Sequence, residues 1–224
     1  MMKYLLTFAS LALLGAAQSA SAAHIYAEVG DAGQTLATAQ LVPGGTEIIT
    51  GFGTSADPDS ADIFAFNWGG GGLLIDTFQA DTEMDTQLQL FDSSGFGILG
   101  NDDHGGACTG TPGGDFQSCL DLSAGLAAGT YYLAITGFNN DALDASNNLI
   151  FPCLFGTSDQ CAADPLAGPL AGWGDATPSD DTSSYTINFS AATSDGGPAP
   201  MPEPGILVLL GIGLAGLAIT RRRR

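Results

Sequence analysis

Apolar and polar residues alternate along the middle of the chain with a period of two residues. In residues 63–68, for example, Phe64, Phe66 and Trp68 fall on one face. Because successive side chains of a β-strand point to opposite faces of a sheet, this period is typical of half-buried strands. The same alternation occurs in residues 86–91, 131–136 and 185–189. We therefore expect strands at these four positions.

Turn-forming residues separate these stretches. Gly, Pro, Asp and Ser favour tight turns through their backbone conformations and local hydrogen bonds, and they gather at residues 43–45, 57–59, 69–72, 92–95 and 128–129. The chain shows no amphipathic helix of the length that a crossover between parallel strands needs. The pattern predicts an all-β fold, an antiparallel β-sandwich.

The N-terminal residues 1–23 have the pattern of a secretory signal peptide. Lys3 is followed by an apolar run from Leu5 to Ala17 and by small residues up to Ala23. This order predicts a signal helix that signal peptidase removes after Ala22 or Ala23. The exported domain is then expected to span residues 24–193.

The C-terminal residues combine three further elements after a linker at 194–201. They are Pro202-Glu203-Pro204, an uncharged run over 206–220 that predicts a transmembrane helix, and the cluster Arg221, Arg222, Arg223 and Arg224. Such a run spans roughly 22 Å, which is enough for a membrane only with local thinning or snorkelling arginines. The arginines favour a cytoplasmic C-terminus, which leaves the domain outside.

This order of elements resembles the PEP-CTERM sorting signal of Gram-negative bacteria, over residues 202–224. The resemblance implies recognition by an exosortase, a membrane protease and transpeptidase that removes the helix near the Pro-Glu-Pro element. The chain would be anchored in the inner membrane, facing the periplasm, until processing, and would then reach the cell surface or the extracellular space. Export of this kind is often associated with exopolysaccharide and biofilm production.

Charge excludes several functions for the exported domain. The chain has 24 acidic and 5 basic residues, and no lysine or arginine occurs between Tyr4 and Thr220. Nucleic-acid binding, or membrane binding through a basic patch, requires cations that this domain lacks. Lysine-dependent catalysis and phosphate-binding P-loops are excluded for the same reason.

The domain also resembles a known family of secreted modules. Residues 62–66, 85–92 and 128–133, with the intervening Gly95 and 101–103, resemble successive motifs of the bacterial pre-peptidase C-terminal domain. The resemblance implies a jelly-roll-like β-sandwich, and some members of that family bind calcium or matrix polymers. Residues 138–184 form a long insertion relative to it, and no protease precedes the domain, so no protease-associated role follows.

The four cysteines predict two disulfides, because exported chains fold in oxidising compartments. Three pairings are possible. We favour the local ones, Cys108 with Cys119 and Cys153 with Cys161, each of which closes a short loop. The spacing and the scarcity of histidine argue against a zinc site.

No catalytic set is recognisable, and we expect a protein that is not an enzyme. His104 is the one plausible base, and no nucleophile motif accompanies it. A carbohydrate-binding or carbohydrate-active protein is the alternative. Its features would be Trp173 stacking on sugar rings in a glycine-rich loop and a pair of carboxylates chosen from the many available.

Calcium is the cofactor that the acidic turns favour, since hard cations take six to eight oxygen ligands. In calcium-binding relatives of the pre-peptidase family the ligands lie in the N-terminal segment and just before the first strand of the alternating set. The resemblance therefore implies a first candidate set, with Gly30-Asp31 replacing the family's Asn-Asp. A second set follows the strand at 86–91 and could close on Asp92. Solvated turn acids are the competing interpretation of both. The two sets are Glu28, Asp31, Asp57, Asp59 and Asp62, and Asn101, Asp102 and Asp103.

Together these features predict a non-catalytic protein of the cell envelope or extracellular matrix. Exosortase and signal peptidase are its expected processing partners, and exopolysaccharide is a candidate ligand. An acidic domain would be repelled by an anionic polysaccharide unless divalent cations bridge the two.

Overall fold

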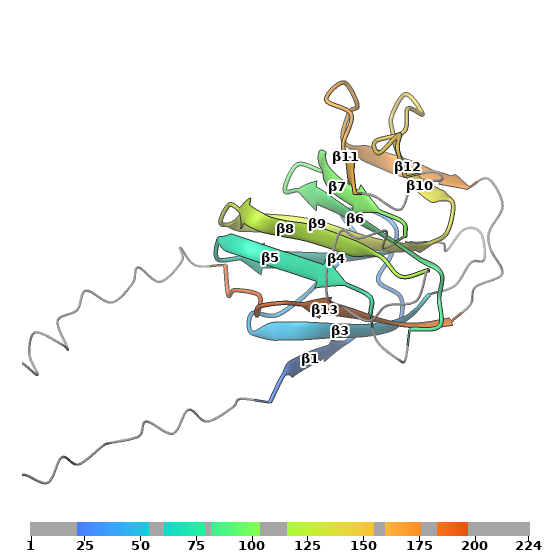
Figure 1. The fold of residues 1–224 in the computed structure, drawn as a ribbon. Helices are drawn as coiled ribbons and strands as arrows, with labels where there is room; N and C mark the ends of the chain where they lie inside the picture. The colour runs from blue at the N-terminus through green and yellow to red at the C-terminus, as the bar shows by residue number, and fades with distance from the viewer. Residues whose placement is uncertain are drawn as a thin grey trace, which may run out of the picture.

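The computed structural model describes residues 22–53, 61–78, 82–103, 116–154, 160–175 and 183–196. Within these ranges the chain is all-β, and two open sheets pack face to face (Figure 1). The β-sandwich expected from the alternating pattern is therefore confirmed. Both proposed terminal helices lie outside the described ranges. None of these ranges contains a helix that is long and apolar enough to cross a membrane.

The first sheet has the strand order β1-β3-β13-β5-β8, and the second has the order β11-β7-β6-β9-β4-β2. Neighbouring strands are antiparallel except in the pairs β1–β3 and β2–β4. A separate ribbon consists of β10 and β12. The strands are β1 His24–Ala27, β2 Gln40–Leu41, β3 Thr46–Gly53, β4 Ala61–Trp68, β5 Gly71–Asp76, β6 Thr86–Asp92, β7 Gly97–Asn101, β8 Cys119–Leu126, β9 Gly129–Gly137, β10 Asn140–Asp144, β11 Cys161–Ala162, β12 Leu170–Asp175 and β13 Ser183–Phe189.

The main core lies between the two sheets. The alternating residues of β4 and β13 supply its aromatic part, in which Phe66 packs edge-on against Phe189 with ring centroids 5.2 Å apart. Phe64 contacts Tyr185 in the same way at 6.4 Å. Burying one such side chain stabilises the fold by about 1.5–3 kcal/mol.

The second sheet is buried on both faces, which differs from the half-buried strands that alternation predicts. On its outer face, Ile63 and Phe91 pack against Ile150, Phe151 and other residues of the segment 138–175. The described part of this segment therefore forms a second, outer core. The alternation in β6 does not reveal this, because Gln87 and Gln89 on its outer face are polar and yet buried.

Glycines on β7 allow the insertion to approach the sheet. A Cβ atom at Gly100 would lie 3.1 Å from Cγ of Phe151, and one at Gly97 would collide with Ile150. The predicted Cys153–Cys161 disulfide is present in this segment, with 5.4 Å between the Cα atoms. Cys119 also takes part in a disulfide, whereas Cys108 lies outside the described residues.

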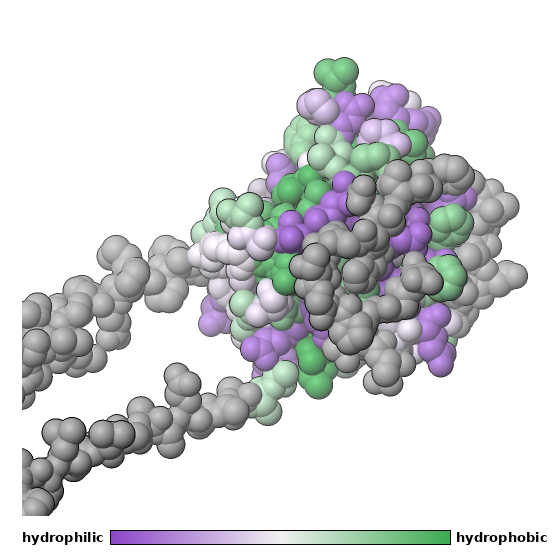
Figure 2. Space-filling model, viewed as in Figure 1, coloured by the Kyte–Doolittle hydropathy of each residue, from purple (hydrophilic) through white to green (hydrophobic). Residues whose placement is uncertain are grey.

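Large apolar side chains are scattered over the surface. In the view of Figure 2, hydrophobic and hydrophilic residues are interspersed over the strands. The most exposed large apolar residues, Leu166 at 90% and Val29 at 74%, lie in separate connecting segments. Scattered apolar residues of this kind are normal for a soluble surface.

We expect Phe151→Ala to destabilise the domain by about 3–5 kcal/mol, because it opens a cavity in the outer core where Phe151 is 1% exposed. Urea unfolding of the exported domain measures the change. Leu166→Ala is the matched control and should alter stability by less than about 0.5 kcal/mol. A cost below about 1 kcal/mol for Phe151→Ala would show that the insertion does not pack on the sheet.

Candidate metal centres

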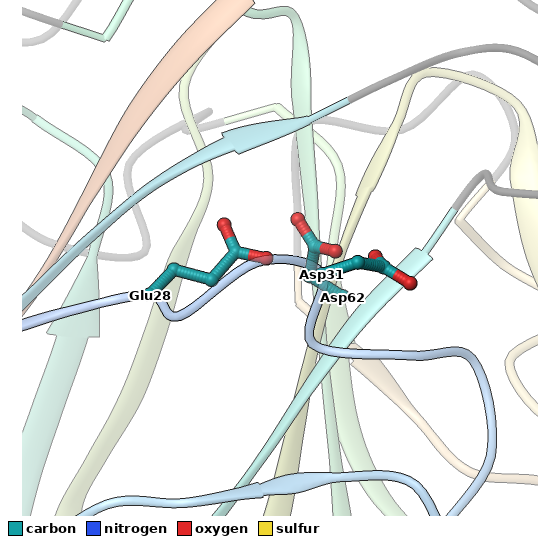
Figure 3. Close-up of side chains that lie close together, drawn as sticks. All are labelled: Glu28, Asp31 and Asp62. Carbon is teal, nitrogen blue, oxygen red and sulfur yellow. The ribbon is translucent and has the colours of Figure 1, made fainter.

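Three acidic side chains from two separate parts of the chain meet near the end of β3. Glu28 and Asp31 come from the segment that follows β1, and Asp62 is the second residue of β4 (Figure 3). One carboxylate oxygen of each lies within 4.8 Å of the others. We call these residues the first acidic cluster. They are three of the five residues in the first predicted set; the other two, Asp57 and Asp59, lie outside the described residues.

Glu28 is fixed by hydrogen bonds from three groups. The backbone N–H of Ala32 donates to its Oε1 at 2.9 Å, and that of Phe52 donates to its Oε2 at 3.1 Å. The Tyr185 hydroxyl donates to the same Oε2 at 3.1 Å. Gly51 is required here, because a Cβ atom on it would collide with Tyr185 and Glu28. The carboxylate is therefore held in one position before any ligand arrives.

Tyr185 is 1% exposed and stays a neutral donor. Burial raises the pKa of its hydroxyl far above the usual range, and the nearby charges of Asp62 and Glu28, together with its hydrogen bonds to them, raise it further. A phenol in this state keeps its proton and donates a hydrogen bond to a carboxylate at any physiological pH. Tyr185 thus serves the cluster as an orienting residue.

The first cluster concentrates negative charge without a basic neighbour, since no lysine or arginine occurs between residues 4 and 220. Two carboxylates about 4 Å apart repel each other by about 1–4 kcal/mol, depending on the local dielectric. A divalent cation would replace this repulsion with attraction. Hard cations such as Ca²⁺ take carboxylate, carbonyl and water oxygens at such sites.

A second acidic cluster lies at one end of two interior strands of the second sheet, where β6 begins and β7 ends. It consists of Asp85, Asp102 and Asp103, with one oxygen of each within 4.8 Å of the others. The hairpin register explains the meeting, because Leu88 pairs with Asn101. The residue before β6 therefore lies beside the residues after β7.

Asp102 is 1% exposed, and its environment favours the protonated form. Burial, followed by the charges of Asp103 and Asp85, raises its pKa to about 7, although a hydrogen bond with the Gln87 amide opposes the shift. Asp141 adds a smaller electrostatic contribution. Burial also raises the pKa of Asp141 itself. The Asp102 carboxyl is therefore partly protonated near neutral pH.

The other residues around the second cluster have structural contacts. The Asn101 side chain accepts a hydrogen bond from the Cys119 N–H at 2.7 Å and donates one to the Asp103 carbonyl at 2.8 Å. These bonds orient the chain after β7. Asp92 does not join the cluster, because it is the last residue of β6 and lies at the strand end opposite Asp85. Its Oδ1 accepts from the backbone N–H groups of Ser94 and Phe96 in its own turn.

Trp173 lies on β12 and is half-buried. Its indole N–H donates to the Gln34 carbonyl at 2.9 Å, and its ring packs against the outer core. Both the indole N–H and the ring of Trp173 thus make contacts within the domain. The sorting residues Pro202, Glu203, Pro204 and Arg221 to Arg224 lie outside the described residues.

Two acids in or near the second cluster, Asp85 and Asp141, are absent from the predicted set. Asp85 could have been found, because it directly precedes a strand whose hairpin partner ends at Asn101-Asp102-Asp103. Asp141 belongs to the insertion, and no local pattern places it near Gln87.

In EDTA, the free energy of unfolding should fall as the pH rises from 5 to 7 and should level off above 7. The unfolded Asp102 carboxyl ionises near 3.8, whereas the folded one keeps its proton until about 7. The folded state thus binds more protons in this interval, and the slope is at most about 1.4 kcal/mol per pH unit. Asp102→Asn should remove most of this slope in chemical denaturation. Equal slopes for the variant and the wild type would contradict the assignment.

Comparison with known proteins finds similarity to a solved structure and a match of the tail to a family motif. The chain is similar to the solved structure of the pre-peptidase C-terminal domain of collagenase from Bacillus anthracis, with 12% sequence identity and a TM-score of 0.32 over 67% of this chain and 93% of that chain. No curated protein matches it. Residues 202–224 match the PEP-CTERM protein-sorting motif, which confirms the resemblance of the tail and indicates an exported protein of Gram-negative bacteria that an exosortase sorts.

Proposed function

We propose that the chain is a non-catalytic component of the cell envelope or extracellular matrix, anchored transiently in the inner membrane by its tail and dependent on calcium. The match of residues 202–224 to the sorting motif carries this proposal. The motif accounts for export and processing by an exosortase. The domain between the two ends then determines what the released protein does.

The calcium part of the proposal rests on the first acidic cluster. Its three carboxylates come from two chain segments, one of them already fixed by three hydrogen-bond donors. Bound calcium would tie the segment after β1 to the start of β4. Ca²⁺ on an acidic surface would also let the domain associate with an anionic exopolysaccharide, which would otherwise repel it.

A carbohydrate-active role receives less support. The contacts of Trp173 with Gln34 and the outer core stabilise the insertion. They leave the indole less suited to stacking on a sugar ring than the glycine-rich sequence around it predicts.

Deletion of Pro202, Glu203 and Pro204 should leave the unprocessed chain in the membrane fraction of a host that contains an exosortase. Deletion of Pro198, Ala199 and Pro200 shortens the chain equally and should leave processing intact. Immunoblots of membrane, cell-surface and medium fractions report both outcomes. Normal release after the first deletion would contradict sorting through this motif.

Millimolar Ca²⁺ should raise the melting temperature of the exported domain and should release or absorb heat in calorimetric titration. Extracellular modules bind this ion with dissociation constants of about 10⁻⁴–10⁻³ M, and a ligand at 100 times its dissociation constant stabilises by about 2.7 kcal/mol. Asp31→Asn should abolish most of the shift, and because Asp31 is exposed the variant should fold normally.

Glu47→Gln is the matched control for this measurement. It removes one negative charge from β3 at the end opposite Glu28 and should keep the calcium response. A melting shift that is identical in wild type and Asp31→Asn would place the calcium elsewhere. Absence of any shift or heat up to about 10 mM would reject a calcium site of the affinity typical of extracellular modules.

A further inference from the structure

The first and last described residues leave the sandwich at the same end. His24 begins β1 and pairs with Thr46, the first residue of β3. Thr193, just after β13, donates its N–H to the Thr46 carbonyl at 2.8 Å. Ser194 then donates to the carbonyl of Asn67 near the end of β4, also at 2.8 Å. Figure 1 shows β1 starting, and the segment after β13 leaving, on the same side. We call this the terminal end.

Both acidic clusters lie at the opposite end. Glu28 contacts Phe52 near the last residue of β3, and Asp62 lies near the first residue of β4. Asp85 accepts a hydrogen bond at its carbonyl from the N–H of Phe138, which follows the last residue of β9. Strands β1, β3, β4, β6 and β9 thus run between the terminal end and the neighbourhood of these clusters. We call this the acidic end.

More acids lie at one end than at the other. The described turns of the terminal end are residues 42–45, 69–70, 93–96, 127–128 and 190–196, and they contain a single acid, Asp195. The other acids toward this end are Glu47 and Asp92 on strands, and Asp144 and Asp164 in the outer layer, where Leu170 donates its N–H to the Gly95 carbonyl. The acidic end carries both clusters and also Glu83 and Asp141. Among the described residues, the acidic end therefore carries more acids and both groups of closely spaced carboxylates.

We infer that the membrane-anchored form stands in one orientation, with the terminal end facing the bilayer and the acidic end facing away from it. This inference rests on the proposed anchoring through residues 206–220. The surface that faces the bilayer is then the end formed by residues 42–45, 69–70, 93–96, 127–128 and 190–196. Polymers of the envelope would meet the acidic end.

Chain length supports this orientation. Between Gly196, the last described residue, and the apolar run lie residues 197–205. Fully extended, they reach at most about 32 Å. The nine residues of β9 alone extend about 30 Å from one end of the domain to the other. An inverted domain would need this linker at nearly full extension along its side, at a large cost in conformational entropy.

Electrostatics supports it independently. A bilayer with anionic lipid repels carboxylates, and the repulsion acts over a Debye length of about 8–10 Å. Placing the acidic end more than twice that distance from the bilayer removes most of this repulsion. The nearly uncharged turns of the terminal end can approach the lipid headgroups without it.

Energy transfer to the bilayer tests the orientation. A dye is attached to p-azidophenylalanine introduced either at Ala128, in an exposed turn of the terminal end, or at Phe138, which is 37% exposed at the acidic end. The exported chain with its tail intact is reconstituted into vesicles of phosphatidylethanolamine and phosphatidylglycerol that carry a headgroup-linked acceptor. Transfer from position 128 should be at least about twofold more efficient, because roughly 33 Å along β9 separates the positions.

Flotation of the same vesicles distinguishes failure of the proposed anchoring from failure of the inferred orientation. If the chain does not float with the vesicles, the proposed anchoring is wrong and the orientation falls with it. If the chain floats but both positions transfer equally, or position 138 transfers better, anchoring stands and the orientation is overturned. As a matched control, a flexible ten-residue Gly–Ser insertion after Gly196 should reduce the difference between the positions, because the longer linker allows the domain to reorient.

Discussion

Every carboxylate of the exported domain has to be accommodated without a basic partner, because lysine and arginine occur only in the two terminal segments. Five described acids meet this constraint locally. Hydrogen bonds from the backbone of Gly168 and from Asn148 hold the pKa of the Asp144 carboxyl well below its usual range. The carboxylates of Asp76, Asp92, Asp121 and Asp164 each accept a hydrogen bond from the backbone N–H two residues further on. Turns rich in aspartate thus supply their own donors, which is the physical reason that such residues are common there.

In the two acidic clusters, hydrogen bonds from nearby backbone groups do not fully offset the negative charge. In the first, Glu28 receives three donors but brings its charge close to Asp31 and Asp62. In the second, Asp102 is buried beside two other acids and keeps a proton to about pH 7. A proton and a divalent cation are the two remaining ways to neutralise such groups. The antiparallel topology collects these groups at one end of the sandwich and leaves the first and last described residues at the other.

The alternation of apolar residues predicts the sandwich well, because β4, β6, β9 and β13 each present such a face to the main core. It does not predict the outer core, since Phe151 and Ile150 reach the sheet through contacts that are distant in sequence and depend on glycines in β7. For the first cluster, sequence reasoning places Glu28, Asp31 and Asp62 in one set. For the second, it predicts Asp102 and Asp103 but lacks the hairpin register that brings Asp85 beside them. Asp85, which neither adjacency in the sequence nor the resemblance links to the other acids, is thus harder to predict.

The most direct test of a cation requirement is a crystal structure of the exported domain grown with calcium, with anomalous scattering used to locate the ion. The account predicts an anomalous peak bonded to Glu28, Asp31 and Asp62, at calcium–oxygen distances of about 2.3–2.6 Å. Well-ordered side chains at these positions with no anomalous peak between them, in crystals saturated with calcium, would contradict it.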